Sequence, residues 1–134
     1  MQLYLVQHGA AKSEAEDPER SLTAEGTNAV ERIAKYLSSR RLEVGRIEHS
    51  DKQRARQTAE ILAAHLRPQG GTREIARIAP NDGVGPMCER LQKESGRLML
   101  VGHLPYLSRL LSVLLGVHPD RAHGDLSDGR SRRP

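Results

Sequence analysis

Two short apolar runs constrain the fold of this chain most strongly. The runs Leu3–Val6 and Leu98–Val101 are continuous rather than alternating, which is typical of strands buried on both faces of a sheet. A third short strand is predicted over 46–50, and a weak one over 73–78. Since strands of this kind need helices on both faces, the runs favour a largely parallel sheet.

Helical patterns alternate with these strands. Thr23 can cap the first helix, and Ser50 with Gln53 matches the capping box that opens a second one. Residues 10–22 are polar and irregular, which predicts a loop. This alternation predicts an α/β fold, a single-domain three-layer α/β/α sandwich with a mostly parallel sheet. The predicted helices cover residues 24–41, 50–66, 84–95 and 105–116.

The length and the cysteine content bound the domain organisation. The chain has 134 residues, which is enough for one domain, and its single cysteine, Cys88, excludes an intramolecular disulfide framework. Its apolar runs all fall short of the roughly 18 residues that a membrane span needs, and the first residues lack a signal-peptide pattern. We therefore expect a cytoplasmic protein with no membrane partner. The predicted domain covers 1–117, and the polar stretch 118–134 is predicted to be a disordered tail.

The charge balance bears on the class of partner. The formal net charge is +4, yet most lysines and arginines alternate with acidic residues, and the chain has no Trp or Phe and only three Tyr. Because single-stranded nucleic acids stack on aromatic side chains, this composition argues against a nucleic-acid partner. A modest basic surplus suits a phosphorylated substrate equally well.

Polar residues follow three of the predicted strands directly. They are Gln7-His8-Gly9, the segment 50–54 and Gly102-His103. Because parallel sheets bind ligands outside the carboxyl ends of their strands, both histidines and Arg54 are predicted to lie at one sheet edge. A neutral imidazole can attack phosphorus to form a phosphohistidine, while Arg54 and a second histidine stabilise the transferring group without a metal.

Taken singly, each of these residues has a simpler structural interpretation. His8 can be a strand-end histidine whose ring bonds to backbone, and His103 can be an ordinary helix-start residue. Arg54 alone is most often a solvated charge on a helix. Asp82, in the loop 80–82, is more typical of a turn or cap than of a catalytic acid. The register of the three segments is what favours a site.

These segments resemble the histidine phosphatase superfamily. The motifs are Gln7-His8-Gly9, the stretch 50–59 with Arg54, Gln57 and Thr58, and 101–105 with His103 and Pro105. They are most similar to short phosphohistidine phosphatases of the SixA type, and Arg20-Ser-Leu-Thr23 resembles a further segment of that group. The resemblance covers residues 1–117 and implies a phosphoglycerate-mutase-like fold.

The resemblance also implies roles for the residues. His8 would be the phosphorylated nucleophile, and Arg54 and His103 would hold the phosphoryl oxygens with Arg20 as a further contact. Gln7 and Gly9 complete the expected phosphate-binding set, and no metal or other cofactor is expected. The implied substrate is phosphohistidine on a signalling protein, such as the histidine phosphotransfer domain of a sensor kinase.

The chain departs from the family pattern at two places. The family motif begins Arg-His-Gly, whereas residue 7 here is a glutamine, which donates hydrogen bonds but carries no charge. Arg20 or Lys12 can compensate for the missing charge. Relatives also continue past the last helix with another strand, whereas 118–134 has no strand pattern, so a truncation or a change of reading frame is one hypothesis.

Three functions follow from these patterns. The first is a metal-independent phosphatase that dephosphorylates protein phosphohistidine in signal transduction. The second is a phosphomonoesterase for a small phosphorylated metabolite. The third, which Gln7 favours, is a catalytically weak module that binds phosphate or a phosphoprotein. The general acid is unassigned by the motifs, and Asp82 is the available carboxylate that we consider for this role.

Overall fold

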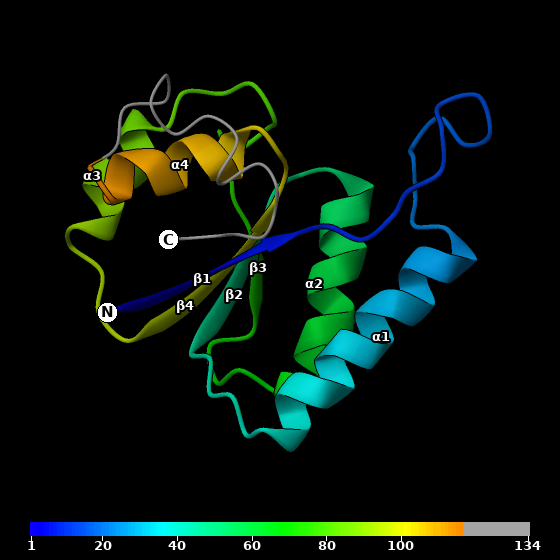
Figure 1. Cartoon of the computed structure of the whole chain (residues 1–134), viewed down its shortest axis with the longest axis horizontal. Coiled ribbons are helices and arrows are strands. Elements are labelled where there is room, and N and C mark those ends of the chain that lie inside the picture. Colours follow the sequence, from blue (N-terminus) through cyan, green and yellow to red (C-terminus); the bar gives the residue numbers. More distant parts are fainter. Residues whose placement is uncertain (117–134) are drawn as a thin grey trace.

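The structure, a computed structural model, describes residues 1–116. The predicted boundary at residue 117 and the predicted tail 118–134 lie outside the described residues. Helices and strands alternate along the described chain (Figure 1). The elements are β1 (Gln2–Gln7), α1 (Ala24–Ser39), β2 (Arg46–His49), α2 (Gln53–Leu66), β3 (Thr72–Glu74), α3 (Gly85–Leu91), β4 (Arg97–Gly102) and α4 (Tyr106–Leu114).

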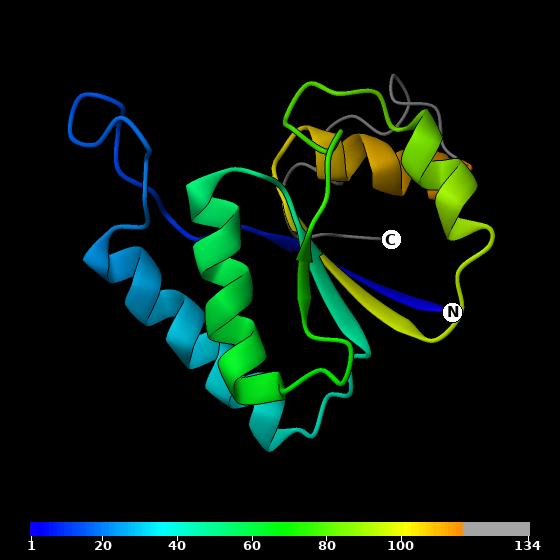
Figure 2. The same ribbon diagram turned by 180° about the vertical axis from the view of Figure 1, so that it is seen from behind.

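The described strands form one parallel sheet in the order β1-β4-β2-β3. Helices α1 and α2 cover one face of the sheet, and α3 and α4 cover the other (Figures 1 and 2). This arrangement confirms the predicted α/β fold with three layers. Because all strands run the same way, their carboxyl ends lie at one edge of the sheet.

Strand β4 shows why a continuous apolar run predicts a doubly covered strand. Its residues alternate between two cores: Met99 and Val101 pack under α1 and α2, whereas Leu98 and Leu100 pack under α3 and α4. All of these side chains are buried. The run 3–6 in β1 also contacts both cores, but β1 lies at the edge of the described sheet, so its side chains are only half-buried.

Several predicted boundaries shift in the structure. The helix predicted over 24–41 begins after Thr23, whose side chain accepts a hydrogen bond from the Gly26 N–H as predicted, but it ends at Ser39. The weak strand predicted over 73–78 is shorter, because only Thr72–Glu74 pairs with β2, and all three of its residues are exposed. The helix predicted over 84–95 covers Gly85–Leu91.

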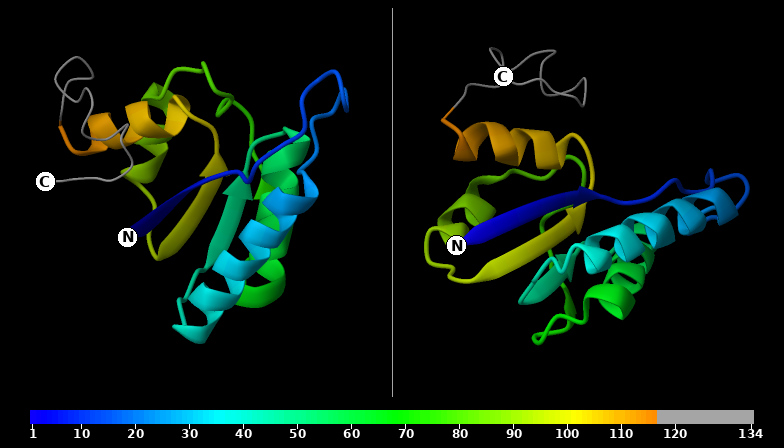
Figure 3. Two further views of the ribbon diagram at one scale, coloured as in Figure 1. Left: turned by 45° about the vertical axis from the view of Figure 1, so that its right-hand side comes forward. Right: turned by 60° about the horizontal axis from the view of Figure 1, so that its bottom comes forward.

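The loop predicted over 10–22 is confirmed, and both of its ends are held in place. Ala11 and Leu22 pair in an isolated bridge, and the Leu22 N–H donates to the side-chain oxygen of Gln57 at 2.8 Å. Gly26 allows α1 to pack on the loop, since a Cβ there would lie 2.2 Å from the carbonyl oxygen of Ala10. Figure 3 shows this dark blue loop extending past the carboxyl end of the sheet.

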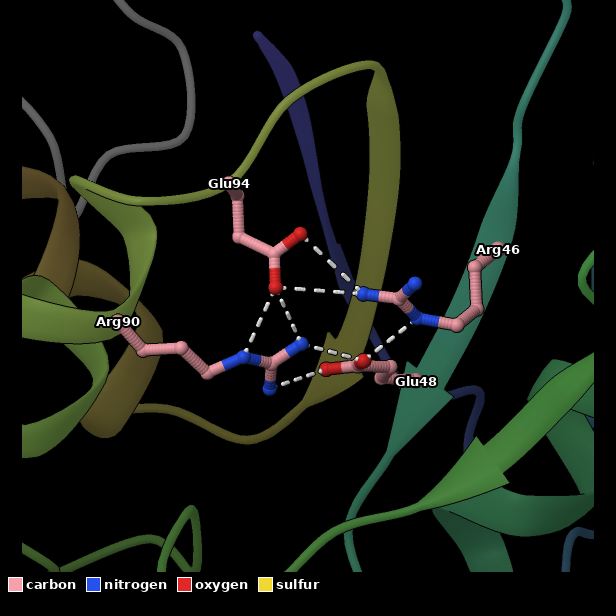
Figure 4. Close-up of polar contacts among 4 residues, drawn as sticks. All are labelled: Arg46, Glu48, Arg90 and Glu94. Atoms are coloured by element: carbon pink, nitrogen blue, oxygen red, sulfur yellow. Dashed lines mark hydrogen bonds and ion pairs between the residues drawn. The ribbon is translucent and has the colours of Figure 1, made fainter.

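An ion-pair cluster, rather than an apolar contact, joins β2 to α3. Glu48 is completely buried on the α3 side of the sheet, and its carboxylate accepts hydrogen bonds from Arg46 and Arg90 at 2.5–2.7 Å. Glu94 bonds both arginines in turn (Figure 4). Burial raises the pKa of the Glu48 carboxyl, but the two arginines outweigh it and hold the pKa below its ordinary range.

Candidate active site

The carboxyl ends of β1 and β4 bring two histidines together. His8 follows β1 directly, and its N–H donates to the carbonyl of Gly102, the last residue of β4, at 3.0 Å. His103 is the next residue after that strand. The centroids of the two rings are 5.0 Å apart, and their planes are inclined by 57°. The parallel pairing of neighbouring strands therefore places residues 95 positions apart side by side.

The backbone fixes the proton on the His8 ring. Its Nδ1 lies 2.6 Å from the carbonyl oxygen of Gly9. Since a carbonyl only accepts hydrogen bonds, Nδ1 carries the hydrogen and Nε2 keeps a free lone pair. Burial lowers the pKa of His8, the bond to Gly9 opposes this, and the charges of Arg54 and Arg20 lower it further. His8 is therefore neutral near pH 7, as a nucleophile must be.

Helix α2 clamps the turn that carries His8. The Gly9 N–H donates to the hydroxyl oxygen of Thr58 at 3.0 Å, and the Thr58 hydroxyl donates to the Arg54 carbonyl at 2.8 Å. A Cβ at residue 9 would lie 2.8 Å from a methyl carbon of Val30, so a glycine fits here best. The motif residue Thr58 thus has a structural role that its position in the sequence alone does not reveal.

Arg54 supplies a fixed positive charge beside the histidines. It is the second residue of α2, and its Nε is buried with no hydrogen-bond partner among the described residues. Burial and the nearby charge of Arg20 both lower the pKa of the guanidinium. Two arginines held near one another at the start of a helix are unfavourable unless an anion joins them. This arrangement favours a phosphate-sized oxyanion at the site.

A cleft of about 720 Å³ lies between the 13–20 loop and the start of α2. Arg20 and Arg54 line it, and the positive charges of the same two arginines lower the pKa of His8. Arg20 lies on the loop between β1 and α1, and its Nε donates to the carbonyl of Lys12 at 2.9 Å. His8 and His103 themselves are not part of the lining. The remaining lining residues are Ser13, Glu14, Pro18, Glu19, Asp51, Lys52, Gln53 and Arg56.

Ser50 holds the second histidine, and this contact was not predicted. The Ser50 hydroxyl lies 2.6 Å from Nε2 of His103, and both residues are about 1% exposed. The predicted capping box is wrong: α2 begins at Gln53 with Lys52 as its N-cap and no side-chain cap, because Ser50 turns toward His103 instead. Burial lowers the pKa of His103 to about 4, and His8, Arg54 and Lys52 contribute.

Two other predicted site residues make no hydrogen bond to this cluster among the described residues. Gln7 is exposed at the end of β1, opposite Gly102 in the pairing with β4. The Asp82 carboxylate accepts a hydrogen bond from the Ala79 N–H at 2.9 Å, which is the behaviour of a turn residue. Within residues 1–116 no hydrogen bond joins either side chain to the histidines. Their roles at the site stay predictions.

Two further histidines of the described residues, His65 and His49, have structural partners. His65 bonds Glu31 at 2.7 Å between α2 and α1, and His49 bonds the Ser50 carbonyl at 2.8 Å. Among the residues that the structure covers, no cluster of three or more His, Cys, Asp or Glu is placed to hold a metal ion. In the same part of the chain, every helix is too short or too polar to cross a membrane.

The buried His103 is expected to make folding stability depend on pH. Its pKa is about 4 in the folded protein against an ordinary 6.5, so the unfolded chain binds more protons between these values. Between pH 6.5 and 5, we expect His103 to lower the free energy of unfolding by about 1–2 kcal/mol, and the effect should fade out above about pH 7.5, where the unfolded imidazole is neutral as well. Urea unfolding of wild type and His103→Gln across this pH range measures the effect. If the free energy of unfolding falls with pH as steeply in the variant as in the wild type, His103 is not its cause.

Comparison with known proteins identifies the family of this chain. The family model of the histidine phosphatase superfamily (branch 1) matches residues 3–76. An uncharacterized protein of Picosynechococcus is 36% identical over 115 residues, a match that spans 80% of this chain and 68% of the relative. The phosphohistidine phosphatase SixA of Escherichia coli is 28% identical over 119 residues, covering 85% and 74%.

Solved structures show the same fold. The histidine phosphatase SixA complexed with tungstate has a TM-score of 0.75 at 26% identity, with 84% of this chain and 75% of that one covered. A phosphoglycerate mutase of Plasmodium falciparum has a TM-score of 0.67 at 22% identity, with 96% and 76% covered. The predicted phosphoglycerate-mutase-like fold is confirmed, and the relatives support a phosphatase.

Proposed function

Because this chain belongs to the histidine phosphatase superfamily, we propose that it is a metal-independent phosphatase that forms a phosphohistidine intermediate on His8. The observation that carries the proposal is the pairing of a neutral His8 with the buried His103, 5.0 Å between ring centroids, next to the unpartnered Nε of Arg54. A nucleophile, a neutral donor and a fixed cation are the groups that phosphoryl transfer requires.

The reaction proceeds in two displacements. The Nε2 lone pair of His8 attacks phosphorus, the bond from phosphorus to the leaving group breaks, and the leaving group departs with a proton. Water then attacks the phosphohistidine, the N–P bond breaks and inorganic phosphate forms. Arg54, Arg20 and His103 bind the equatorial oxygens, with Gln7 and the Gly9 region completing the pocket. Their donors stabilise the charge that spreads over these oxygens.

We assign protein phosphohistidine as the substrate, with a histidine phosphotransfer domain as the partner. SixA of Escherichia coli, a relative, is named for this activity. The cleft also favours it, because charged and polar side chains from the 13–20 loop and the start of α2 line it. Such a surface suits a phosphorylated side chain presented by another protein better than an apolar leaving group. A cytoplasmic location and a signalling role belong to the same proposal.

The leaving imidazole of phosphohistidine must be protonated as it departs. Asp82 is the proposed proton donor. To act on a bound substrate, its carboxyl group would have to leave its hydrogen bond with the Ala79 N–H. The demand on this acid is smaller than for an alkyl phosphate, because a protonated imidazole leaves readily. A weak or distant acid therefore fits phosphohistidine better than a sugar phosphate.

A substrate panel tests the proposed function. Initial rates on a phosphorylated histidine phosphotransfer domain are compared with rates on p-nitrophenyl phosphate and on a sugar phosphate. The highest kcat/KM is expected on the phosphoprotein. Preference for the sugar phosphate would instead indicate the metabolite phosphomonoesterase. Phosphate binding without turnover of any substrate would indicate the catalytically weak binding module that Gln7 favours.

Restoring the family's charge at residue 7 is expected to speed the enzyme. A charge-assisted hydrogen bond contributes about 1.5–3 kcal/mol, so Gln7→Arg should raise kcat/KM on the phosphoprotein roughly tenfold to a hundredfold. Gln7 is exposed, so the longer side chain has room. Gln69→Arg is the matched control, since it adds the same charge at an exposed residue after α2. An equal rate for Gln7→Arg and wild type would contradict this expectation and show that the site has adapted to Gln7 or is inactive.

A further inference from the structure

The hydrogen bond between Ser50 and His103 gives a role to a residue that lies outside the proposed catalytic set. We propose that Ser50 is a positioning residue that fixes the His103 ring in the tautomer with its proton on Nδ1, so that Nδ1–H donates to a phosphoryl oxygen. The proposal rests on the proposed function of His103 as a phosphoryl ligand. Its structural part, the tautomer, can be tested without any substrate.

The direction of the hydrogen bonds follows from the partners of the Ser50 hydroxyl. Its oxygen accepts from the backbone N–H of Lys52 at 3.3 Å. Its own proton has one acceptor among the described residues, Nε2 of His103 at 2.6 Å. If the serine donates to Nε2, that nitrogen carries no hydrogen and the ring proton must lie on Nδ1. The reverse orientation would leave the buried serine proton without an acceptor.

The backbone holds Ser50 in this position. Its N–H donates to the Val101 carbonyl of β4 at 3.4 Å, and its own carbonyl accepts from Nδ1 of the buried His49 at 2.8 Å. These contacts fix the serine against the strand that carries His103. A hydroxyl with so little freedom can select one ring tautomer, as neighbouring groups do for other histidines.

The other ring nitrogen of His103 is left for the substrate. Nδ1 is buried and has no hydrogen-bond partner within residues 1–116. Burial of a donor without a partner is unfavourable, and an incoming phosphoryl oxygen would satisfy it. Ser50 thereby keeps His103 a neutral donor, while the positive charge at the site comes from Arg54 and Arg20.

Nitrogen NMR tests the tautomer directly. In the ¹⁵N-histidine-labelled full chain, two-bond proton–nitrogen correlations distinguish a protonated nitrogen from an unprotonated one, and His103→Gln assigns the signals. We expect His103 to show protonated Nδ1 and unprotonated Nε2 at pH 7. Ser50→Ala should mix the two tautomers, and Ser50→Thr should keep the first. Ser112→Ala, which removes another buried serine hydroxyl, bonded to the Ser108 carbonyl, should change nothing. A proton on Nε2 in the wild type would overturn the proposal.

Kinetics provide the second readout. Ser50→Ala should lower kcat/KM on p-nitrophenyl phosphate about tenfold, the size of one lost hydrogen bond, and Ser50→Thr should restore most of it. Unchanged kinetics in Ser50→Ala would overturn the role in catalysis. Should Ser50→Ala fail to fold, the wild-type spectrum and Ser50→Thr still decide the tautomer. An inactive wild type with the expected tautomer would refute only the proposed function.

Discussion

Replacing His8 with asparagine is expected to abolish turnover, lowering kcat/KM at least about 10⁴-fold, as removal of a nucleophile does in other covalent enzymes. The expectation follows from the free Nε2 of a ring whose Nδ1 is tied to the Gly9 carbonyl. Asparagine can keep that tie through its side-chain amide, so the fold and the phosphate pocket should survive. Steady-state rates on phosphoprotein and on p-nitrophenyl phosphate measure the loss.

The matched control is another histidine with a hydrogen-bonded ring. His65 bonds Glu31 between α2 and α1, away from the site, so His65→Asn should change kcat/KM less than about twofold. Binding of tungstate, measured by calorimetry, should persist in His8→Asn because Arg54 and His103 remain. Retention of more than a tenth of the wild-type rate in His8→Asn would mean that the reaction does not pass through this imidazole.

The largest expected effect on stability comes from Glu48→Ala. The carboxylate is completely buried and bonded to Arg46 and Arg90, so its removal leaves two partly buried guanidinium groups with Glu94 as their shared partner. Breaking a buried ion pair on one side typically costs about 3–5 kcal/mol. We expect a loss of about 3 kcal/mol in the free energy of unfolding, measured by urea denaturation at pH 7.

An exposed ion pair provides the comparison for Glu48. Glu43 bonds Arg97 at 2.8 Å, but its side chain is 78% exposed, so Glu43→Ala should cost no more than about 0.5 kcal/mol. Both variants delete one carboxylate that is bonded to arginine, and they differ mainly in burial. Equal losses in the two variants would show that the cluster between β2 and α3 does not stabilise the fold through the burial of Glu48.

The sequence predicts the layered fold because its strongest signals are local. Continuous apolar runs in β1 and β4 require cover on both faces, and the parallel arrangement then places the residues after each strand at one edge. The placement of His8 and His103 at the same edge follows from this rule, and the pairing of β1 with β4 then brings them side by side. Thr23 as a helix cap is equally local, since its hydrogen bond spans three residues.

Contacts between distant residues could not be predicted in this way. The spacing of Ser50 and Gln53 matches a capping box, yet a histidine 53 residues further along competes for the serine hydroxyl. Glu48 stands in a strand without an apolar pattern, and its partner Arg90 lies 42 residues away on another element. Both cases depend on which side chains the tertiary fold brings together, and one sequence does not record that.

The most direct test of the reaction through His8 is to trap its intermediate. Wild type mixed with a ³²P-labelled phosphohistidine phosphotransfer domain is quenched within milliseconds in base and digested, and the labelled peptide is sequenced. A nucleophilic His8 should give a base-stable, acid-labile label on the peptide that contains it, and His8→Asn should give none. If the wild type releases phosphate but no label is found on that peptide, or the label is found on His103, the proposed mechanism is contradicted.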